Sequence, residues 1–164
     1  MSLGKQDVYD YLTEKGIAYE VTEHKAIFHM GEDTGVAFPY PGCDAKNLFL
    51  RDKKKKEYYL ITVKGDKRVD LKRFRDEHGT RALTFASPED LLALMALTPG
   101  SVTPFGLLND AECRVRFYLD SDFFDAPGKI GVHPNENTAT LWLDAADLEA
   151  LIREHGTRVE RWRV

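Results

Sequence analysis

Cysteine is scarce in this 164-residue chain, and the two that occur, Cys43 and Cys113, lack the paired spacing of a metal site. Long apolar runs are missing too: Leu91 to Leu97 is far shorter than the ~20 residues that a membrane span needs. The first twelve residues carry charges where a signal peptide would need an apolar stretch. We therefore expect a cytoplasmic protein with no membrane partner, whose cysteines are free thiols.

Sequence motifs of several common enzyme classes are also absent. The chain has no phosphate-binding Gly-x-x-x-x-Gly-Lys-Ser/Thr, no dinucleotide-binding Gly-x-Gly-x-x-Gly, no Gly-x-Ser-x-Gly of serine hydrolases and no His-Glu-x-x-His of zinc proteases. Its five histidines, at positions 24, 29, 78, 133 and 155, have no ligand spacing, so we expect no metal site.

The charge is distributed unevenly along the chain. The net charge is -4, but residues 51–81 carry twelve basic and six acidic side chains, whereas the segments on either side are acidic. One basic zone on an acidic protein is the pattern expected when one face binds a polyanion, although a solvated charged face is commoner.

The periodicity of apolar residues predicts one domain over residues 1–164, in which helices and strands are mixed without strict alternation. Helices are expected over residues 4–15, 70–78, 88–97 and 145–155. Strands are expected over residues 17–24, 47–52, 57–63, 83–85, 113–119, 129–133, 138–143 and 157–163. This order favours the α+β class, with a mixed, mainly antiparallel sheet flanked by helices, and it makes residues 47–63 a hairpin around a lysine-rich turn.

Three segments could carry chemistry. Lys46 and Asn47 open an apolar strand, where a lysine that snorkels from the sheet edge is the commoner arrangement. The loop "TPGSVTPFGLLND" has a geometry fixed by glycine and proline, and could either present backbone N–H groups to a ligand or serve as a rigid connector. His133 lies in the turn of "GVHPNENTATLWL", a place where histidine is more often structural than catalytic.

Taken together and in this order, the Lys46-Asn47 step, the Gly100–Pro104 loop and the His133 turn resemble the YbaK/ProX family of aminoacyl-tRNA deacylases over nearly the whole chain. "KNLFLRDKKKKEYYL" and "TPGSVTPFGLLND" are most similar to the stand-alone members, which remove alanine from proline tRNA. The resemblance implies the prolyl-tRNA-synthetase-associated editing-domain fold and hydrolysis without a metal, a cofactor or a covalent intermediate. The implied substrate is aminoacylated tRNA(Pro), and prolyl-tRNA synthetase becomes a partner to test.

The resemblance also implies roles for individual residues. Lys46 would anchor the terminal adenosine, Asn47 would place the aminoacyl group or the attacking water, and His133 would line the pocket. The loop would offer backbone donors to the ester carbonyl, next to a participating 2′-hydroxyl. The loop residues are Gly100, Ser101, Val102, Thr103 and Pro104.

Several neighbouring residues could have either a functional or a structural role. Val102, Phe105 and Leu107 could form walls of a small amino-acid pocket or belong to the core, and we favour the core for Leu107. A hairpin turn of like charges normally serves solubility, so its lysines would bind phosphates at most and would then contribute salt-dependent affinity. These lysines are Lys53, Lys54, Lys55 and Lys56.

Two alternatives to an alanine deacylase remain. One is a deacylase for another small residue, cysteine or serine, although the asparagine after Lys46 favours alanine. The other is a non-catalytic tRNA-binding module of a synthetase complex, which retention of Lys46, the Gly100–Pro104 loop and His133 disfavours. One departure concerns the His24–Phe28 pattern: family members often continue it with threonine, but this chain has His29, so its reading of the tRNA end could be altered.

Overall fold

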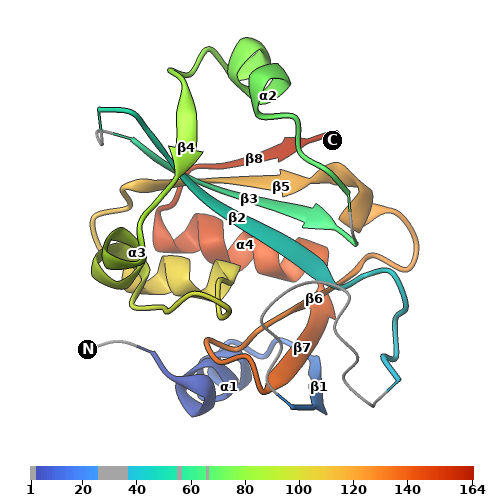
Figure 1. Ribbon diagram of the computed structural model, residues 1–164. Helices are drawn as coiled ribbons and strands as arrows, with labels where there is room; N and C mark the ends of the chain where they lie inside the picture. The colour runs from blue at the N-terminus through green and yellow to red at the C-terminus, as the bar shows by residue number, and fades with distance from the viewer. Residues whose placement is uncertain (1–2, 26–36, 55–56, 66) are drawn as a thin grey trace.

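The computed structural model describes residues 3–25, 37–54, 57–65 and 67–164 (Figure 1). The helices are α1 (Lys5–Glu14), α2 (Leu71–His78), α3 (Pro88–Met95) and α4 (Ala145–His155), with two 3-10 helices, η1 (Pro104–Asn109) and η2 (Ser121–Phe124). The strands are β1 (Tyr19–Glu23), β2 (Ala45–Asp52), β3 (Tyr58–Lys64), β4 (Leu83–Phe85), β5 (Val115–Asp120), β6 (Lys129–Val132), β7 (Ala139–Asp144) and β8 (Val159–Trp162). Each expected helix and strand is present, with ends shifted by a few residues; the two 3-10 helices were not expected.

The strands form two sheets rather than the single sheet that the sequence indicated. The larger has the order β4-β2-β3-β5-β8 and the smaller β1-β7-β6. The pairs β3–β5 and β5–β8 are parallel and the other pairs are antiparallel, which confirms the mixed, mainly antiparallel α+β class. A bridge between Asp44 and Gly131 joins the sheets, and the N–H of Gly131 donates to the carbonyl of Cys43. The start of β2 therefore lies against β6.

Local signals explain where the helices begin. The side chain of Asp70 accepts hydrogen bonds from the backbone N–H groups of Lys72 and Arg73, and Ser87 caps α3 in the same way. Asp144 precedes α4 as expected but makes no side-chain cap; its carboxylate instead lies 2.9 Å from the ammonium of Lys129.

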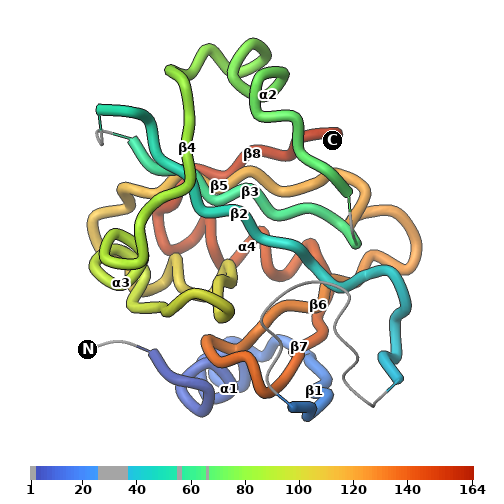
Figure 2. Tube along the Cα trace, viewed as in Figure 1, coloured from blue at the N-terminus to red at the C-terminus, as the bar shows by residue number. Residues whose placement is uncertain are grey.

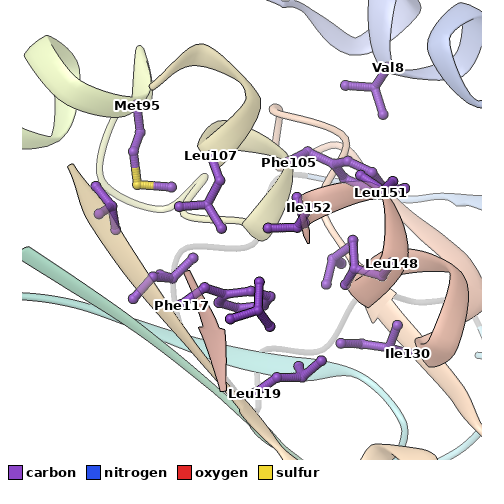
Figure 3. Packing of buried hydrophobic residues seen from close by; sticks show 14 of the residues in the cluster. Val8, Met95, Phe105, Leu107, Phe117, Leu119, Ile130, Leu148, Leu151 and Ile152 are labelled. Atoms are coloured by element: carbon purple, nitrogen blue, oxygen red, sulfur yellow. The ribbon is translucent and has the colours of Figure 1, made fainter. Parts of the chain in front are cut away.

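Two apolar clusters cover the two faces of the larger sheet. The main cluster lies between that sheet, the smaller sheet, α1, α3, η1 and α4. Figure 3 shows Phe105 and Leu107 of η1 in this layer, together with Phe117 and Ile152. The second cluster lies beneath α2 and centres on Phe74. In Figure 1, α2 and α4 accordingly lie on opposite sides of the sheet.

Side chains along β2 alternate between these clusters. Phe49 belongs to the main cluster, whereas Leu48 and Leu50 pack in the cluster beneath α2. Because successive side chains of a strand point to opposite faces, Asn47 shares the face of Phe49 and Lys46 shares the face of Leu48. Two adjacent residues at the start of β2 are thus directed to opposite sides of the sheet.

Two further expectations concern membranes and thiols. None of the helices that the structure describes has the length and apolar character of a membrane span. Cys43 and Cys113 are both free thiols, and Cys43 is buried.

Candidate active site

A small cavity of about 50 Å³ lies between the two sheets, where the start of β2 meets the ends of β6 and β7. Its polar side comprises Asp44, Asn47, His133 and Thr140, and the remaining lining residues are Phe38, Ala45, Gly131 and Val132. Two sequence-predicted residues, Asn47 and His133, are therefore brought together from positions far apart in the chain.

The imidazole of His133 is neutral and has a defined tautomer. Its Nδ1 lies 3.1 Å from the carbonyl oxygen of Ala139, and because a carbonyl only accepts, Nδ1 carries the proton. Burial lowers the pKa of His133 below its usual value of 6.5; the carbonyl of Ala139 opposes this shift, and nearby His24 adds to it. At neutral pH His133 therefore holds an unprotonated Nε2, which is a hydrogen-bond acceptor and a potential base.

The amide of Asn47 is oriented by a neighbour on β3. Asn47 and Thr62 are directly paired across β2 and β3, and the Thr62 hydroxyl donates a 2.5 Å hydrogen bond to Oδ1 of Asn47. Because its oxygen is engaged, Asn47 has the two N–H donors of Nδ2 left for the cavity. The cavity thus combines a donor from β2 with an acceptor at the end of β6.

A second histidine adjoins the cavity. His24 Nδ1 lies 2.7 Å from the carbonyl of Lys25 and so donates, while Nε2 lies 2.8 Å from the hydroxyl of Thr140. The rings of His24 and His133 lie 6.3 Å apart. His24 therefore fixes the Thr140 hydroxyl in the cavity wall. Residues 26–36, including Phe28 and His29, lie outside the described residues.

The Gly100–Pro104 loop adjoins His133 without lining the cavity. Gly100 has a φ of 93°, a conformation that glycine adopts without strain, and the N–H of Ser101 closes a turn onto the carbonyl of Thr98. The hydroxyl of Thr103 donates a 2.6 Å hydrogen bond to the carbonyl of His133. The backbone amides of Val102 and Thr103 have no acceptor within the described part of the chain.

The residues at the end of this loop are less accessible than the sequence suggested. Pro104 and Phe105 are buried, and Phe105 and Leu107 pack inside the main cluster. The structure therefore places Phe105 in the core rather than on a substrate pocket, because η1, which the sequence did not indicate, directs its ring inward. Val102 is partly buried against the same cluster. The apolar walls of the cavity are instead Phe38, Ala45 and Val132.

Lys46 is not brought into the cavity. It follows the alternation of β2 to the opposite face, where its ammonium donates a 3.3 Å hydrogen bond to the carbonyl of Lys67. Lys67 is itself held by Asp120 and Asp122, at 2.8 and 2.5 Å. Lys46 therefore does not line this cavity together with Asn47 and His133, because neighbouring strand residues point to opposite faces of the sheet.

The lysine-rich turn lies at the far end of β2 from the cavity. Lys53 and Lys54 are exposed in the turn between β2 and β3, as a solvated hairpin requires. The trace in Figure 2 shows this turn on the opposite side of the molecule from the place where β2 meets β6. Lys55 and Lys56 lie outside the described residues.

Sequence reasoning missed several groups at this site. Thr62 and Thr140 were expected only as strand residues, and Phe38 was given no role. Gly131 was also unnoticed: a Cβ there would lie 2.6 Å from Cε3 of Trp142, so only glycine lets the indole pack across β6. A glycine within an otherwise apolar strand was the one available signal. Among the described residues no cluster of His, Cys, Asp or Glu could hold a metal ion.

Known proteins share both the sequence and the fold. The family model of the aminoacyl-tRNA editing domain matches residues 41–151. The chain is 36% identical over 152 residues to the prolyl-tRNA editing protein ProX of Acetoanaerobium sticklandii, covering 93% of this chain and 92% of the relative. It is 34% identical over 148 residues to prolyl-tRNA synthetase associated domain-containing protein 1 of Bos taurus, covering 88% and 86%.

A solved structure of a candidate trans-editing enzyme for prolyl tRNA synthetase has the same fold. It matches with a TM-score of 0.70 and 24% identity, over 100% of this chain and 99% of that one. Together with the family model and the relatives, this likeness confirms the resemblance read from the sequence. The chain belongs to the aminoacyl-tRNA editing domain family.

Proposed function

We propose that this protein is a trans-editing deacylase that hydrolyses the ester of mischarged tRNA(Pro), with alanyl-tRNA(Pro) as its main substrate. The observation that carries the proposal is one cavity lined by both Asn47, whose amide N–H donors are not used by Thr62, and His133, whose Nδ1 is held by the carbonyl of Ala139. Family membership and the 36% identical ProX relative support the same activity.

The geometry suits attack by water on an ester. In this scheme water adds to the carbonyl carbon, the bond from that carbon to the ribose oxygen breaks, and the ribose oxygen leaves with a proton. Nε2 of His133 accepts a proton from the water and returns it to the ribose oxygen, as a neutral imidazole can. Nδ2 of Asn47 donates to the carbonyl oxygen as it becomes negative. One backbone N–H of the Gly100–Pro104 loop, which adjoins His133, would be a second donor. The neighbouring 2′-hydroxyl of the ribose is placed to share the proton transfer.

The size of the cavity supports alanine as the proposed substrate. A synthetase site built for proline excludes a smaller amino acid poorly, since one missing methylene is worth only about 1–3 kcal/mol. A separate editing site can hydrolyse the smaller amino acid that the synthetase site failed to exclude. A cavity of about 50 Å³ with Phe38, Ala45 and Val132 as walls favours a methyl side chain over a pyrrolidine ring. Serine and cysteine are close in size to alanine and form the nearest alternatives.

Cations outside the cavity would bind the rest of the tRNA. We assign Lys46 to a phosphate or to the terminal adenosine, because its ammonium lies on the far side of the sheet from Asn47. Lys53 is seven residues further along the chain, about 23 Å away for an extended strand. Lys53 and Lys54 would therefore reach the acceptor stem rather than the ester.

We infer that residues 1–164 form one editing domain, because elements from Val8 to Val159 share the main apolar cluster. We also propose that the protein acts in the cytoplasm, where charged tRNA is used. Prolyl-tRNA synthetase is a further proposed partner, since a mischarged tRNA is released from that enzyme.

The test is deacylation of purified alanyl-, seryl- and cysteinyl-tRNA(Pro), with prolyl-tRNA(Pro) as the cognate control. We expect the wild type to turn over alanyl-tRNA(Pro) fastest and to spare prolyl-tRNA(Pro). Asn47→Ala should lower the rate about 100-fold or more, the usual cost of losing one oxyanion donor. Faster hydrolysis of the seryl or cysteinyl ester would reassign the substrate. Binding without any hydrolysis would indicate the non-catalytic tRNA-binding module.

A further inference from the structure

We propose that Thr62 is a positioning residue that sets the catalytic orientation of Asn47. This inference rests on the proposed deacylase function and adds a residue to its site. Thr62 is fully buried in the middle of the larger sheet, and its hydroxyl donates the 2.5 Å hydrogen bond to Oδ1 of Asn47.

The need for such a residue follows from the shape of an amide. The oxygen and nitrogen ends of a carboxamide are nearly equal in size, so packing alone does not distinguish the two orientations that differ by a half-turn. Hydrolysis of the ester requires one of these two amide orientations. Nδ2 can donate to a developing oxyanion, whereas Oδ1 in the same place would repel it.

Among the described residues, Thr62 is the one shown hydrogen-bonded to the amide of Asn47. The lining residues Ala45 and Val132 have apolar side chains that cannot hold either end of the amide. Thr62 is directly opposite Asn47 in the β2–β3 register, on the same face of the sheet. In the structure its hydroxyl donates to Oδ1, and in this arrangement Oδ1 lies towards β3 and Nδ2 is left for the cavity.

The sheet makes this hydroxyl a rigid support. Thr62 is flanked on β3 by Ile61 and Val63, both fully buried, and β3 is paired on both sides, with β2 and with β5. The position of the hydroxyl is therefore fixed by the central part of the fold rather than by a loop. Removing the hydroxyl while keeping the shape should disturb the orientation of Asn47 but not the fold.

The experiment compares Thr62→Val with Thr62→Ser in single-turnover and steady-state deacylation of alanyl-tRNA(Pro). Valine keeps the shape and loses the hydroxyl; serine loses a methyl group and keeps the hydroxyl. We expect Thr62→Val to lower kcat about tenfold or more with KM nearly unchanged, and Thr62→Ser to retain most of the rate. In an Asn47→Ala background, Thr62→Val should cause no further loss.

Thr157 provides a matched control. It is a buried threonine whose hydroxyl has no partner among the described residues, and it does not line the cavity. Thr157→Val should leave kcat unchanged. If Thr62→Val does not fold, the pair Thr62→Ala and Thr62→Ser replaces it, because these two variants differ by the hydroxyl alone.

The outcomes separate the two claims. A folded Thr62→Val enzyme with wild-type kcat overturns the inference and leaves the proposed function standing. Thr62→Ser as slow as Thr62→Val, or an equal loss from Thr62→Val in the Asn47→Ala background, also overturns it, since packing would then be the cause. A wild type that hydrolyses none of the esters overturns the proposed function and this inference with it.

Discussion

The hydroxyl of Thr103 donates a 2.6 Å hydrogen bond to the backbone carbonyl of His133. Thr103 is fully buried at the end of the Gly100–Pro104 loop, and His133 directly follows β6. A contact across 30 residues of sequence thus couples the loop that carries the proposed amide donors to the strand end that carries the imidazole. This bond ties the position of the loop to the position of the strand end.

Loss of that bond should be costly for both stability and rate. Thr103→Val leaves the carbonyl of His133 without its donor, and an unsatisfied buried polar group costs about 1–3 kcal/mol. We expect the free energy of unfolding in urea to fall by that amount, and kcat for alanyl-tRNA(Pro) to fall about tenfold. Thr103→Ser should restore most of both values. Equal kcat for Thr103→Val and the wild type would show that the loop is positioned without this bond.

The pKa of His133 predicts how the rate and the stability depend on pH. Burial lowers this pKa, so the folded protein keeps a neutral imidazole somewhat below pH 6.5. The acid limb of the kcat profile should therefore lie below pH 6.5 and disappear in His133→Gln, whose residual rate should be small. A limb at or above pH 6.5 would contradict a role for neutral His133.

The same pKa shift affects unfolding. Above pH 6.5 both the folded and the unfolded chain hold His133 neutral, and its contribution to stability is complete. As the pH falls below 6.5 the unfolded chain binds the proton first, so the free energy of unfolding declines until the pH passes the lower folded pKa. Urea unfolding between pH 7.5 and pH 5 should show a steeper decline for the wild type than for His133→Gln.

Much of the fold could be predicted from the sequence, because helix caps, apolar periodicity and turn residues indicated the same elements. The helices expected over residues 70–78 and 88–97 are present, capped by Asp70 and Ser87, and the run from Asn47 to Val63 forms the expected hairpin. The division into two sheets was not legible. It depends on which strands pair, and strand pairing leaves no signal in a single sequence. The packing of the Trp142 ring over Gly131 was hidden for the same reason, because one glycine carries no signal of what packs over it.

The site was only half predictable for a similar reason. A motif names adjacent residues, but a strand sends neighbours to opposite faces, so Lys46 and Asn47 were grouped although only Asn47 reaches the cavity. Thr62 was missed because it contacts Asn47 only through the pairing of β2 with β3, and a single sequence does not show which strand residues are paired. Phe105 was misplaced because the inward turn of η1 was not recognised.

Gly131 should tolerate no side chain. In Gly131→Ala the new methyl group would overlap the ring of Trp142, and the indole or β6 would have to move. Overpacking of this kind costs about 1–3 kcal/mol, and the displaced strand would change the cavity as well. We expect a lower urea midpoint at unchanged slope, together with reduced discrimination between alanyl- and prolyl-tRNA(Pro). Wild-type stability would show that the Trp142 ring has room to shift.

The turn lysines should affect affinity without affecting chemistry. Neutralising Lys53 and Lys54 together should weaken tRNA binding and reduce the slope of log affinity against log salt by up to about 2, while kcat at saturating tRNA stays the same. The control is the double variant Lys5→Gln, Lys15→Gln at the two ends of α1, where both lysines are already ion-paired. An unchanged salt slope in the Lys53, Lys54 variant would mean that the turn serves only solubility.

Lys46 is predicted to anchor the tRNA rather than to act in the transition state. Its ammonium donates to the carbonyl of Lys67 on the face opposite Asn47, so it cannot contact the ester from this position. Lys46→Ala should raise the Kd for uncharged tRNA(Pro) about tenfold and lower the salt slope by about 1. Its kcat at saturating alanyl-tRNA(Pro) should stay within about threefold of the wild type, since the groups that face the ester are untouched. Lys72→Ala, an exposed cation on α2, is the matched control and should change Kd less. A large loss of kcat with intact binding would mean that the Lys46 side chain moves around the start of β2 when tRNA binds. Lys46 would then be one of the groups that act on the ester.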